Sequence, residues 1–410
     1  MRIRATDRTR WRQTPAGVRD QMPAEVAARR RLEGRLLDLF ARWGYREVAT
    51  PTLEYLDTLL HGAGPGVGDR LLKLVDSGGE VLVLRPEMTV PLARLAATRL
   101  LPAEGGPLRL AYVAPVFRSQ DRGSGRLREF TQAGVELIGD GGVGADVEVI
   151  ALAAEALQAA GVEQPSVSVG HAGFLRGLLA TLPPETADAV RELLYRRAFA
   201  ELVAAVAPGP ALDALRLLPT LHGPEALERA RPLAPGEESR EALDVLRDVL
   251  DGVAAYGLPV RVQVNLGLIR DFDYYSGTVF EAHAPRAGMP LLGGGRYDGL
   301  LARFGRPAPA TGFAIGLERV LEAAPTPEAG RPVVAVAYVP LGYRRAVRIA
   351  ARLREAGFAT VVVSADSGLA DAACTVAVTE AGFTVRTAGR QRPAAADEIT
   401  AAVRAALEGP

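Results

Sequence analysis

Three segments of the sequence combine charged side chains with glycine or aromatic residues in patterns that suit ligand binding. The first, residues 118–132, places Arg118, Arg126 and Arg128 around the glycines of a turn between two strand-like stretches. Several guanidinium groups presented by one hairpin can bind a polyphosphate, because each offers two parallel N–H donors. A solvated, charged hairpin is the alternative when this segment is considered alone.

The second segment, residues 268–281, interrupts an apolar strand pattern with Arg270 and with the adjacent tyrosines Tyr274 and Tyr275. Simple packing of the rings, with their hydroxyls at the surface, is the alternative here. In the third, residues 312–319, an apolar strand leads into a helix that begins with Glu318 and Arg319. Because the helix dipole disfavours a cation at this end, we expect a ligand or an acidic partner to balance Arg319.

The hydrophobic pattern predicts the elements that position these segments. Helical spacing is found at 24–43 and 146–160 and after residue 316, and strand patterns lie at 47–50, 81–85, 108–117, 134–138, 166–169, 261–265 and 277–283. Between about 172 and 258 the periodicity is helical only, which indicates an insertion within the domain. A strand at 333–339, a helix at 344–357 and a strand at 360–363 form a separate α/β unit.

Composition excludes several classes of protein. The 410 residues are 48% hydrophobic, and 48 basic side chains balance 48 acidic ones, which argues against a broad nucleic-acid-binding face. A single cysteine, Cys374, allows neither an intrachain disulfide nor a thiolate metal cluster, and the four histidines lack metal-ligand spacing. We therefore expect no metal and no cofactor. No run reaches membrane-spanning length, so we expect a cytoplasmic protein.

Together with residues 14–20, 84–89 and 293–299, the three segments resemble the motifs of histidine-tRNA ligases and of their regulatory paralogues. The resemblance covers roughly residues 14–322. It implies an α+β fold, with the antiparallel sheet of a class II aminoacyl-tRNA synthetase flanked by helices. Residues 1–322 would form this core, with the helical insertion at about 172–258. A linker at 323–332 would lead to a truncated α/β domain at 333–410, similar to an anticodon-binding domain.

The resemblance also implies a pocket for free histidine, whose ammonium, carboxylate and imidazole groups each need a different partner. By this similarity Glu87, Thr89 and Gln132 hold the ammonium, Arg270 holds the carboxylate, Glu136 and Tyr275 hold the imidazole, and Tyr274 and Tyr297 line the pocket. On the nucleotide side, Arg118 and Arg319 correspond to the arginines that grip ATP, with Arg126 and Phe130 as further candidates. Gln120 replaces an acidic residue, so nucleotide binding is expected to be vestigial.

Several departures from the ligase pattern resemble the regulatory paralogues instead. Met88 stands where ligases have Gly, Asp271 follows Arg270, residues 218–227 resemble the paralogue, and the chain after Val363 lacks a basic, glycine-bearing stretch. Such paralogues assemble with the short-form catalytic subunit of ATP phosphoribosyltransferase and pass on feedback inhibition by L-histidine. The resemblance thus implies a non-catalytic homodimer within a larger hetero-oligomer, with no tRNA bound. A working histidine-tRNA ligase, or a synthetase paralogue for another amino-acid modification, are the alternatives.

Overall fold

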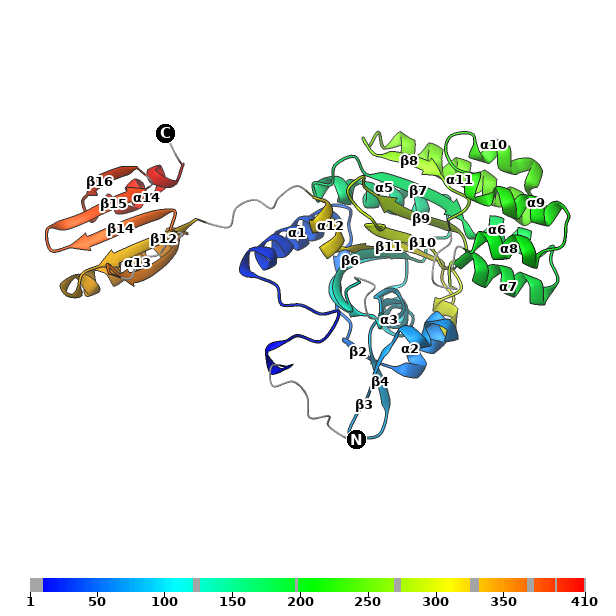
Figure 1. The fold of residues 1–410 in the computed structure, drawn as a ribbon, viewed down its shortest axis with the longest axis horizontal. Helices are drawn as coiled ribbons and strands as arrows, with labels where there is room; N and C mark the ends of the chain where they lie inside the picture. Colours follow the sequence, from blue (N-terminus) through cyan, green and yellow to red (C-terminus); the bar gives the residue numbers. More distant parts are fainter. Residues whose placement is uncertain are drawn as a thin grey trace. The chain divides into compact units, whose positions relative to one another are not determined.

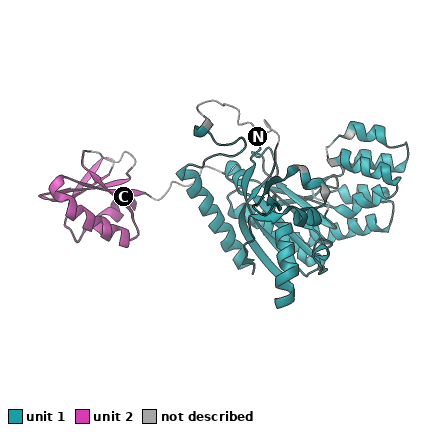
Figure 2. Cartoon of the chain, turned by 90° about the horizontal axis from the view of Figure 1, so that it is seen from below, with its two compact units in different colours: residues 1–327 teal, residues 328–410 magenta. Residues whose placement is uncertain are grey.

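The fold is known from a computed structural model, whose described part comprises residues 10–120, 126–195, 198–268, 274–324, 332–366, 372–387 and 389–408. The chain divides into two compact units, residues 1–327 and 328–410 (Figure 2). Each unit has its own sheet and its own hydrophobic core. None of the helices in these described ranges is long and apolar enough to cross a membrane.

An eight-stranded sheet forms the centre of the first unit, with the order β1-β5-β6-β11-β10-β9-β7-β8 (Figure 1). The strands are β1 (Arg46–Glu47), β5 (Leu108–Phe117), β6 (Glu129–Ile138), β7 (Ser166–His171), β8 (Arg261–Val264), β9 (Thr278–His283), β10 (Leu292–Arg296) and β11 (Ala310–Gly316). Only the pairs at the two edges, β1 with β5 and β7 with β8, are parallel. The predicted α+β class with a mainly antiparallel sheet is confirmed.

Three helices cover one face of this sheet: α1 (Pro23–Arg42), α5 (Val143–Ala159) and α12 (Leu317–Ala323). In α1 the apolar positions fall on one stripe, and Leu32, Leu36 and Phe40 are completely buried. The odd-numbered residues of β6, such as Val135, belong to the same core. Because side chains alternate along a strand, the even-numbered residues of β6 point to the other face.

Gly34 lies on the exposed side of α1, and a β-carbon added there would meet no atom within 4 Å. We expect Gly34→Ala to raise the free energy of unfolding by about 0.5–1 kcal/mol, because alanine loses less backbone entropy than glycine in a helix. Urea unfolding followed by circular dichroism measures this change. An unchanged or lower stability would show that the helix does not form as described.

The other face of the sheet is covered by a smaller layer. It contains α2 (Leu56–Ala63), α3 (Thr89–Leu95), the π-helical turn Ala96–Leu100, α4 (Leu101–Glu104) and the three-stranded sheet of β2 (Leu53–Tyr55), β4 (Val81–Leu84) and β3 (Leu72–Val75). Leu108, Leu110 and Ile138 of the large sheet pack into this layer with residues of α2 and α3. The start of α3 is thereby held close to the even-numbered side of β5 and β6.

In the described part of the chain, six α-helices and two short 3-10 turns lie between β7 and β8, at the place of the predicted insertion. The α-helices are α6 (Ala172–Leu179), α7 (Pro184–Tyr195), α8 (Phe199–Ala205), α9 (Pro210–Leu217), α10 (Ala226–Ala230) and α11 (Glu237–Ala255). Figure 1 shows them gathered at one end of the large sheet. The long helix α11 packs against both α5 and α6, so the insertion shares the core of the first unit.

The second unit is a five-stranded sheet with the order β13-β12-β14-β15-β16 and two helices, α13 (Tyr343–Glu355) and α14 (Ile399–Glu408). Its strands are β12 (Val333–Tyr338), β13 (Ala359–Ser364), β14 (Cys374–Thr379), β15 (Gly382–Thr387) and β16 (Arg390–Ala394). Val334, Val376 and Ile349 are among the residues of its buried core. The sequence predicts the first two strands and α13, but not the antiparallel strands β14 to β16.

Candidate functional site

Five of the predicted site residues lie on the even-numbered side of β6, and hydrogen bonds join four of them, Glu87, Thr89, Glu136 and Tyr297, into one cluster. Glu87 and Thr89 lie at the start of α3, Gln132 and Glu136 lie on β6, and Tyr297 follows β10. Glu136 and Glu87 are 1% and 3% exposed. Two buried carboxyl groups so close together are costly, and the charge of Arg118 offsets only part of this cost at Glu87, so this composition is unusual for a core and typical of a binding site.

The Glu136 carboxyl group is held from two sides. The Thr89 hydroxyl donates a hydrogen bond of 2.9 Å to Oε1, and the Tyr297 hydroxyl donates to Oε2. Burial raises the pKa of Glu136 to about 8, although both hydrogen bonds act in the opposite direction. The carboxyl group therefore loses its proton close to neutral pH, and its pKa lies near the ordinary pKa of an imidazole.

Glu87 is anchored by the backbone amides that follow it and by the Thr89 side chain. The amides of Thr89 and Val90 donate to its two carboxylate oxygens over 2.5 Å and 3.0 Å. Burial raises the pKa of Glu87, and these backbone bonds and the positive charge of Arg118 lower it. Such a fixed carboxylate suits an ammonium group, which offers three donors and no acceptor.

Gln132 carries an unsatisfied acceptor. Its side-chain oxygen is buried and accepts no hydrogen bond from the described part of the chain. An orphaned buried acceptor costs about 1–3 kcal/mol, which a donor on a bound ligand can recover. Gln132 and Glu136 are four residues apart on one strand and so point to the same face.

Tyrosine rings form one side of the cluster. Tyr274 lies between Tyr275 and Tyr297, with ring centroids 4.9 Å and 5.8 Å away. The structure adds Tyr112 of β5, which sequence reasoning missed because it stands within an ordinary apolar strand. Tyr112 is completely buried, its hydroxyl lies 3.5 Å from the Phe313 carbonyl, and burial together with the charges of Glu136 and Glu87 raises its pKa.

The residues predicted for the nucleotide side are engaged differently. Arg118 donates from Nε to the Pro86 carbonyl over 2.8 Å, and its guanidinium lies 5.2 Å from the ring of Phe130. Arg319 donates to the Pro290 carbonyl over 2.8 Å. The Gln120 carbonyl accepts from Arg128, and Arg126 is exposed at the end of the turn. Arg270 and Asp271 lie outside the described residues.

Arg296, next to Tyr297 in the chain, forms ion pairs that stabilise this part of the cluster. It is 6% exposed, and its Nε lies 3.0 Å from a carboxylate oxygen of the buried Asp146 of α5. Its Nη1 also donates to Asp298 over 3.2 Å. Because Arg296 and Asp298 flank Tyr297 in sequence, these bonds fix the backbone that carries the tyrosine to Glu136.

Met88 occupies a different environment from its neighbours Glu87 and Thr89. Its side chain is 1% exposed and belongs to a small apolar cluster with Leu92 and Tyr112. The larger side chain that stands where ligases have glycine is therefore accommodated in the core next to the pocket residues.

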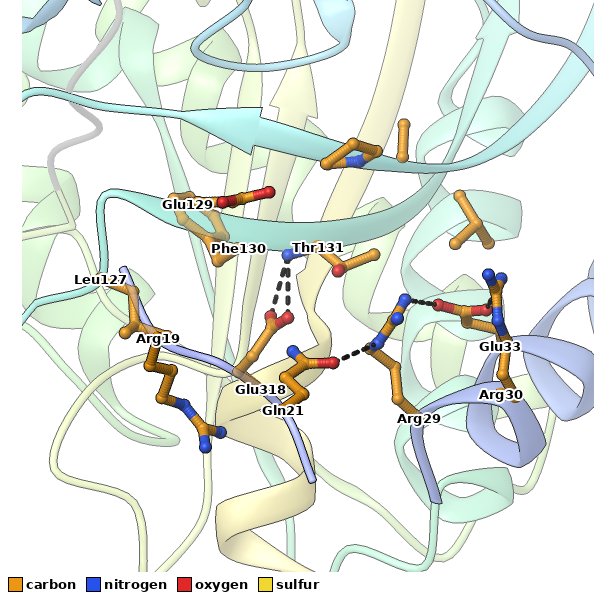
Figure 3. Close-up of a pocket in the computed structure, with 13 residues that line it drawn as sticks. Arg19, Gln21, Arg29, Arg30, Glu33, Leu127, Glu129, Phe130, Thr131 and Glu318 are labelled. Atoms are coloured by element: carbon orange, nitrogen blue, oxygen red, sulfur yellow. Dashed lines mark hydrogen bonds and ion pairs between the residues drawn. The ribbon is translucent and has the colours of Figure 1, made fainter. Parts of the chain in front are cut away.

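Figure 3 shows a separate cavity of about 360 Å³ beside α1. It is lined by Arg19, Gln21, Arg29, Arg30, Glu33, Val113, Ala114, Pro115, Leu127, Glu129, Phe130, Thr131 and Glu318. Thr131 and Val113 are odd-numbered, so most of this cavity lies on the opposite side of the sheet from Glu136. Both carboxylate oxygens of Glu318 accept from the Thr131 amide, at 2.9 and 3.1 Å, which ties α12 to β6. Phe130 alone among the predicted site residues lines it.

Within the described ranges, no three histidine, cysteine, aspartate or glutamate side chains are grouped as metal ligands. The side chains gathered on this side of the sheet, two carboxyl groups, an amide oxygen and the hydroxyls of Tyr112, Tyr274, Tyr275 and Tyr297, offer hydrogen bonding and charge to a small, polar molecule with several donors.

Comparison with known proteins agrees with this chemistry. The model of the histidyl-tRNA synthetase family matches residues 17–320. The ATP phosphoribosyltransferase regulatory subunit of Moorella thermoacetica is 48% identical, over 79% of this chain and 86% of that protein. The protein of the same name from Symbiobacterium thermophilum is 44% identical, over 85% of this chain and 90% of that protein.

A solved structure shows the same relationship. The protein from Bacillus halodurans described as an ATP phosphoribosyltransferase regulatory subunit/histidyl-tRNA synthetase superposes with a TM-score of 0.79. It is 34% identical, and the match covers 88% of this chain and 94% of that one. These comparisons confirm the resemblance predicted from the motifs. The chain thus belongs to the histidyl-tRNA synthetase family, and within it to the group of ATP phosphoribosyltransferase regulatory subunits.

Proposed function

We propose that this chain is the regulatory subunit of a short-form ATP phosphoribosyltransferase and that it binds L-histidine as an effector in the cluster around Glu136. Relatives that cover most of the chain carry this name. The first step of histidine biosynthesis would then depend on a separate catalytic subunit that this chain activates, and histidine would act through this chain.

One observation carries the proposal. The buried Glu136 carboxyl group, held by Thr89 and Tyr297, lies on the same strand face as the unsatisfied oxygen of Gln132. An imidazole N–H paired with Glu136 and an ammonium group paired with Glu87 and Gln132 would satisfy all three acceptors. A ligand that lacks either group would leave a buried polar atom unpaired, which accounts for selectivity towards histidine.

We further propose that the chain performs no catalysis of its own. Gln120 stands where the resemblance would place an acidic residue. Arg118 donates a hydrogen bond to the Pro86 carbonyl, next to the cluster around Glu136. With this bond Arg118 holds the backbone that precedes Glu87. We propose that the active form is a cytoplasmic hetero-oligomer that contains a homodimer of this chain and binds no tRNA.

The effect of histidine on the partner requires a coupling free energy between the two binding events. Such coupling is reciprocal, so substrates of the catalytic subunit should weaken histidine binding by the factor by which histidine weakens theirs.

Purification of the chain with a short-form catalytic subunit tests the function. We expect ATP-dependent phosphoribosyl transfer only when both chains are present, inhibition by L-histidine, and no charging of histidine tRNA by either preparation. Charging of tRNA by this chain alone would contradict the proposal in favour of the ligase. Full activity of the catalytic subunit without this chain would contradict the regulatory role.

A further inference from the structure

Arg85 is a buried cation that neither the ammonium pocket nor the nucleotide side includes. It is 4% exposed and immediately precedes Pro86 and Glu87. Within the described ranges no carboxylate lies within ion-pair distance of its guanidinium. Instead, Nε donates to the Pro115 carbonyl over 2.9 Å, and Nη1 donates to the Thr50 and Pro51 carbonyls over 2.7 and 3.2 Å.

A buried arginine outside ion-pair distance of a carboxylate is costly, because burial disfavours its charged form and lowers its pKa, although the charge of Glu54 acts in the opposite direction. Such a residue needs a structural or functional reason. Its three acceptors come from two chain segments, the loop before β2 and the end of β5. A planar guanidinium with several N–H groups can bridge such segments at once, whereas an ammonium group is a single point charge.

These bonds are part of a short ladder that ends at the site. The Phe117 amide donates to the Arg85 carbonyl over 2.9 Å, and the Arg118 side chain donates to the Pro86 carbonyl over 2.8 Å. The backbone on both sides of Pro86 is thereby fixed to the end of β5. The next residue is Glu87, whose carboxylate is already held by the first amides of α3.

We propose that Arg85 is a positioning residue of the histidine site, which sets the place of the Glu87 carboxylate and so the recognition of the ammonium group of the ligand. The proposal rests on the histidine-binding function proposed above. Arg85 contacts no ligand itself, and its effect is transmitted through Pro86 and Glu87. Loss of Arg85 should therefore affect one end of the ligand and spare the imidazole end, which Glu136 holds from a different strand.

Calorimetric titration with two ligands distinguishes recognition of the ammonium group from recognition of the imidazole group. L-histidine carries the ammonium group, and imidazolepropionate is the same molecule without it. We expect wild type to prefer histidine, and Arg85→Met to reduce this preference about 10-fold or more, with the affinity for imidazolepropionate changed by less than about 3-fold. Arg85→Lys keeps the charge but not the planar fork, so we expect an intermediate preference.

Arg109→Met is the matched control, because Arg109 lies on the same strand as Pro115 but pairs with Glu148 over 2.7 Å on the other side of the sheet. We expect it to lower the melting temperature and to leave the ligand preference unchanged. Equal weakening of both ligands by Arg85→Met, or an unchanged preference in Arg85→Met and Arg85→Lys, would overturn the positioning role. If Arg85→Met does not fold, the Arg85→Lys preference decides in the same way. Absence of histidine binding by wild type would overturn the proposed function itself.

Discussion

Gly312→Ala is expected to abolish histidine binding and to destabilise the first unit. Gly312 of β11 pairs with Glu136 of β6. A β-carbon at this position would lie 1.9 Å from the Glu136 carboxylate oxygen and 2.4 Å from the Val135 carbonyl. The carboxylate can swing away only by leaving Thr89 and Tyr297, and the carbonyl belongs to the sheet itself. We expect the free energy of unfolding to fall by about 1–3 kcal/mol or more, as it does when other well-packed cores receive an extra methyl group.

Gly144→Ala provides a control, because a β-carbon at Gly144 in α5 would meet no atom within 4 Å. This variant should keep the wild-type affinity for histidine, and its melting temperature should equal or exceed that of wild type, because alanine is favoured over glycine in a helix. Calorimetric titration and thermal unfolding of the two variants measure the difference. Binding of histidine by Gly312→Ala with wild-type affinity would show that Glu136 does not occupy the described position in the bound state.

Glu136→Gln is expected to weaken histidine binding by about 10–100-fold, because the amide keeps the shape of the carboxyl group but loses the negative charge opposite the imidazole. The same variant should not unfold the protein. Both hydroxyl groups that hold Glu136 can rotate, so Thr89 and Tyr297 can serve the amide as donor or acceptor. Titration of the variant with histidine checks this prediction. An unchanged dissociation constant would show that Glu136 does not contact the ligand.

The pH dependence of stability gives an independent check of the same residue. Burial raises the pKa of Glu136 to about 8, above its ordinary value of 4.5. Between these two pH values the folded protein binds a proton that the unfolded chain releases, so stability falls as pH rises through this window. The stability of Glu136→Gln does not fall in this way, because glutamine does not titrate. The difference in free energy of unfolding between Glu136→Gln and wild type should therefore increase from pH 5 to pH 9 by on the order of 3 kcal/mol, measured by urea unfolding.

The central strands show what the sequence alone can predict. Residues 108–117 alternate apolar side chains without glycine, and β5 has the predicted bounds. β6 begins at Glu129, five residues before the predicted start at Gly134, because its first positions carry polar side chains that face the pocket and the cavity. A pattern of hydrophobicity cannot recognise a strand whose inner face is polar for a functional reason.

A second strand escapes the hydrophobic pattern because of its glycines. The strands predicted from the sequence do not include residues 293–295, which lie within β10 in the middle of the strand order. A β-carbon at Gly294 would lie 2.2 Å from the Gly312 carbonyl, so glycine serves here to let two strands approach closely. Sequence reasoning treats glycine as a sign of a turn, and the close approach is visible only in three dimensions.

The candidate site was predictable in part, through the resemblance to a known family. Glu87 and Glu136 are identified as site residues by the motifs that carry this resemblance. Tyr112 and Arg85 are not, since a tyrosine suits any strand and an arginine at the end of a strand normally lies in solvent. Their roles depend on burial and on partners far away in the chain, such as Phe313 for Tyr112 and Thr50 for Arg85.

Calorimetric titration of the purified chain with L-histidine, in the absence of any partner, tests the central claim most directly. The structure predicts saturable binding to one site per chain, with an affinity that is at least about 10-fold weaker in Glu136→Gln. No heat of binding with the wild-type chain, or identical binding by wild type and Glu136→Gln, would contradict the assignment of this cluster as the histidine site.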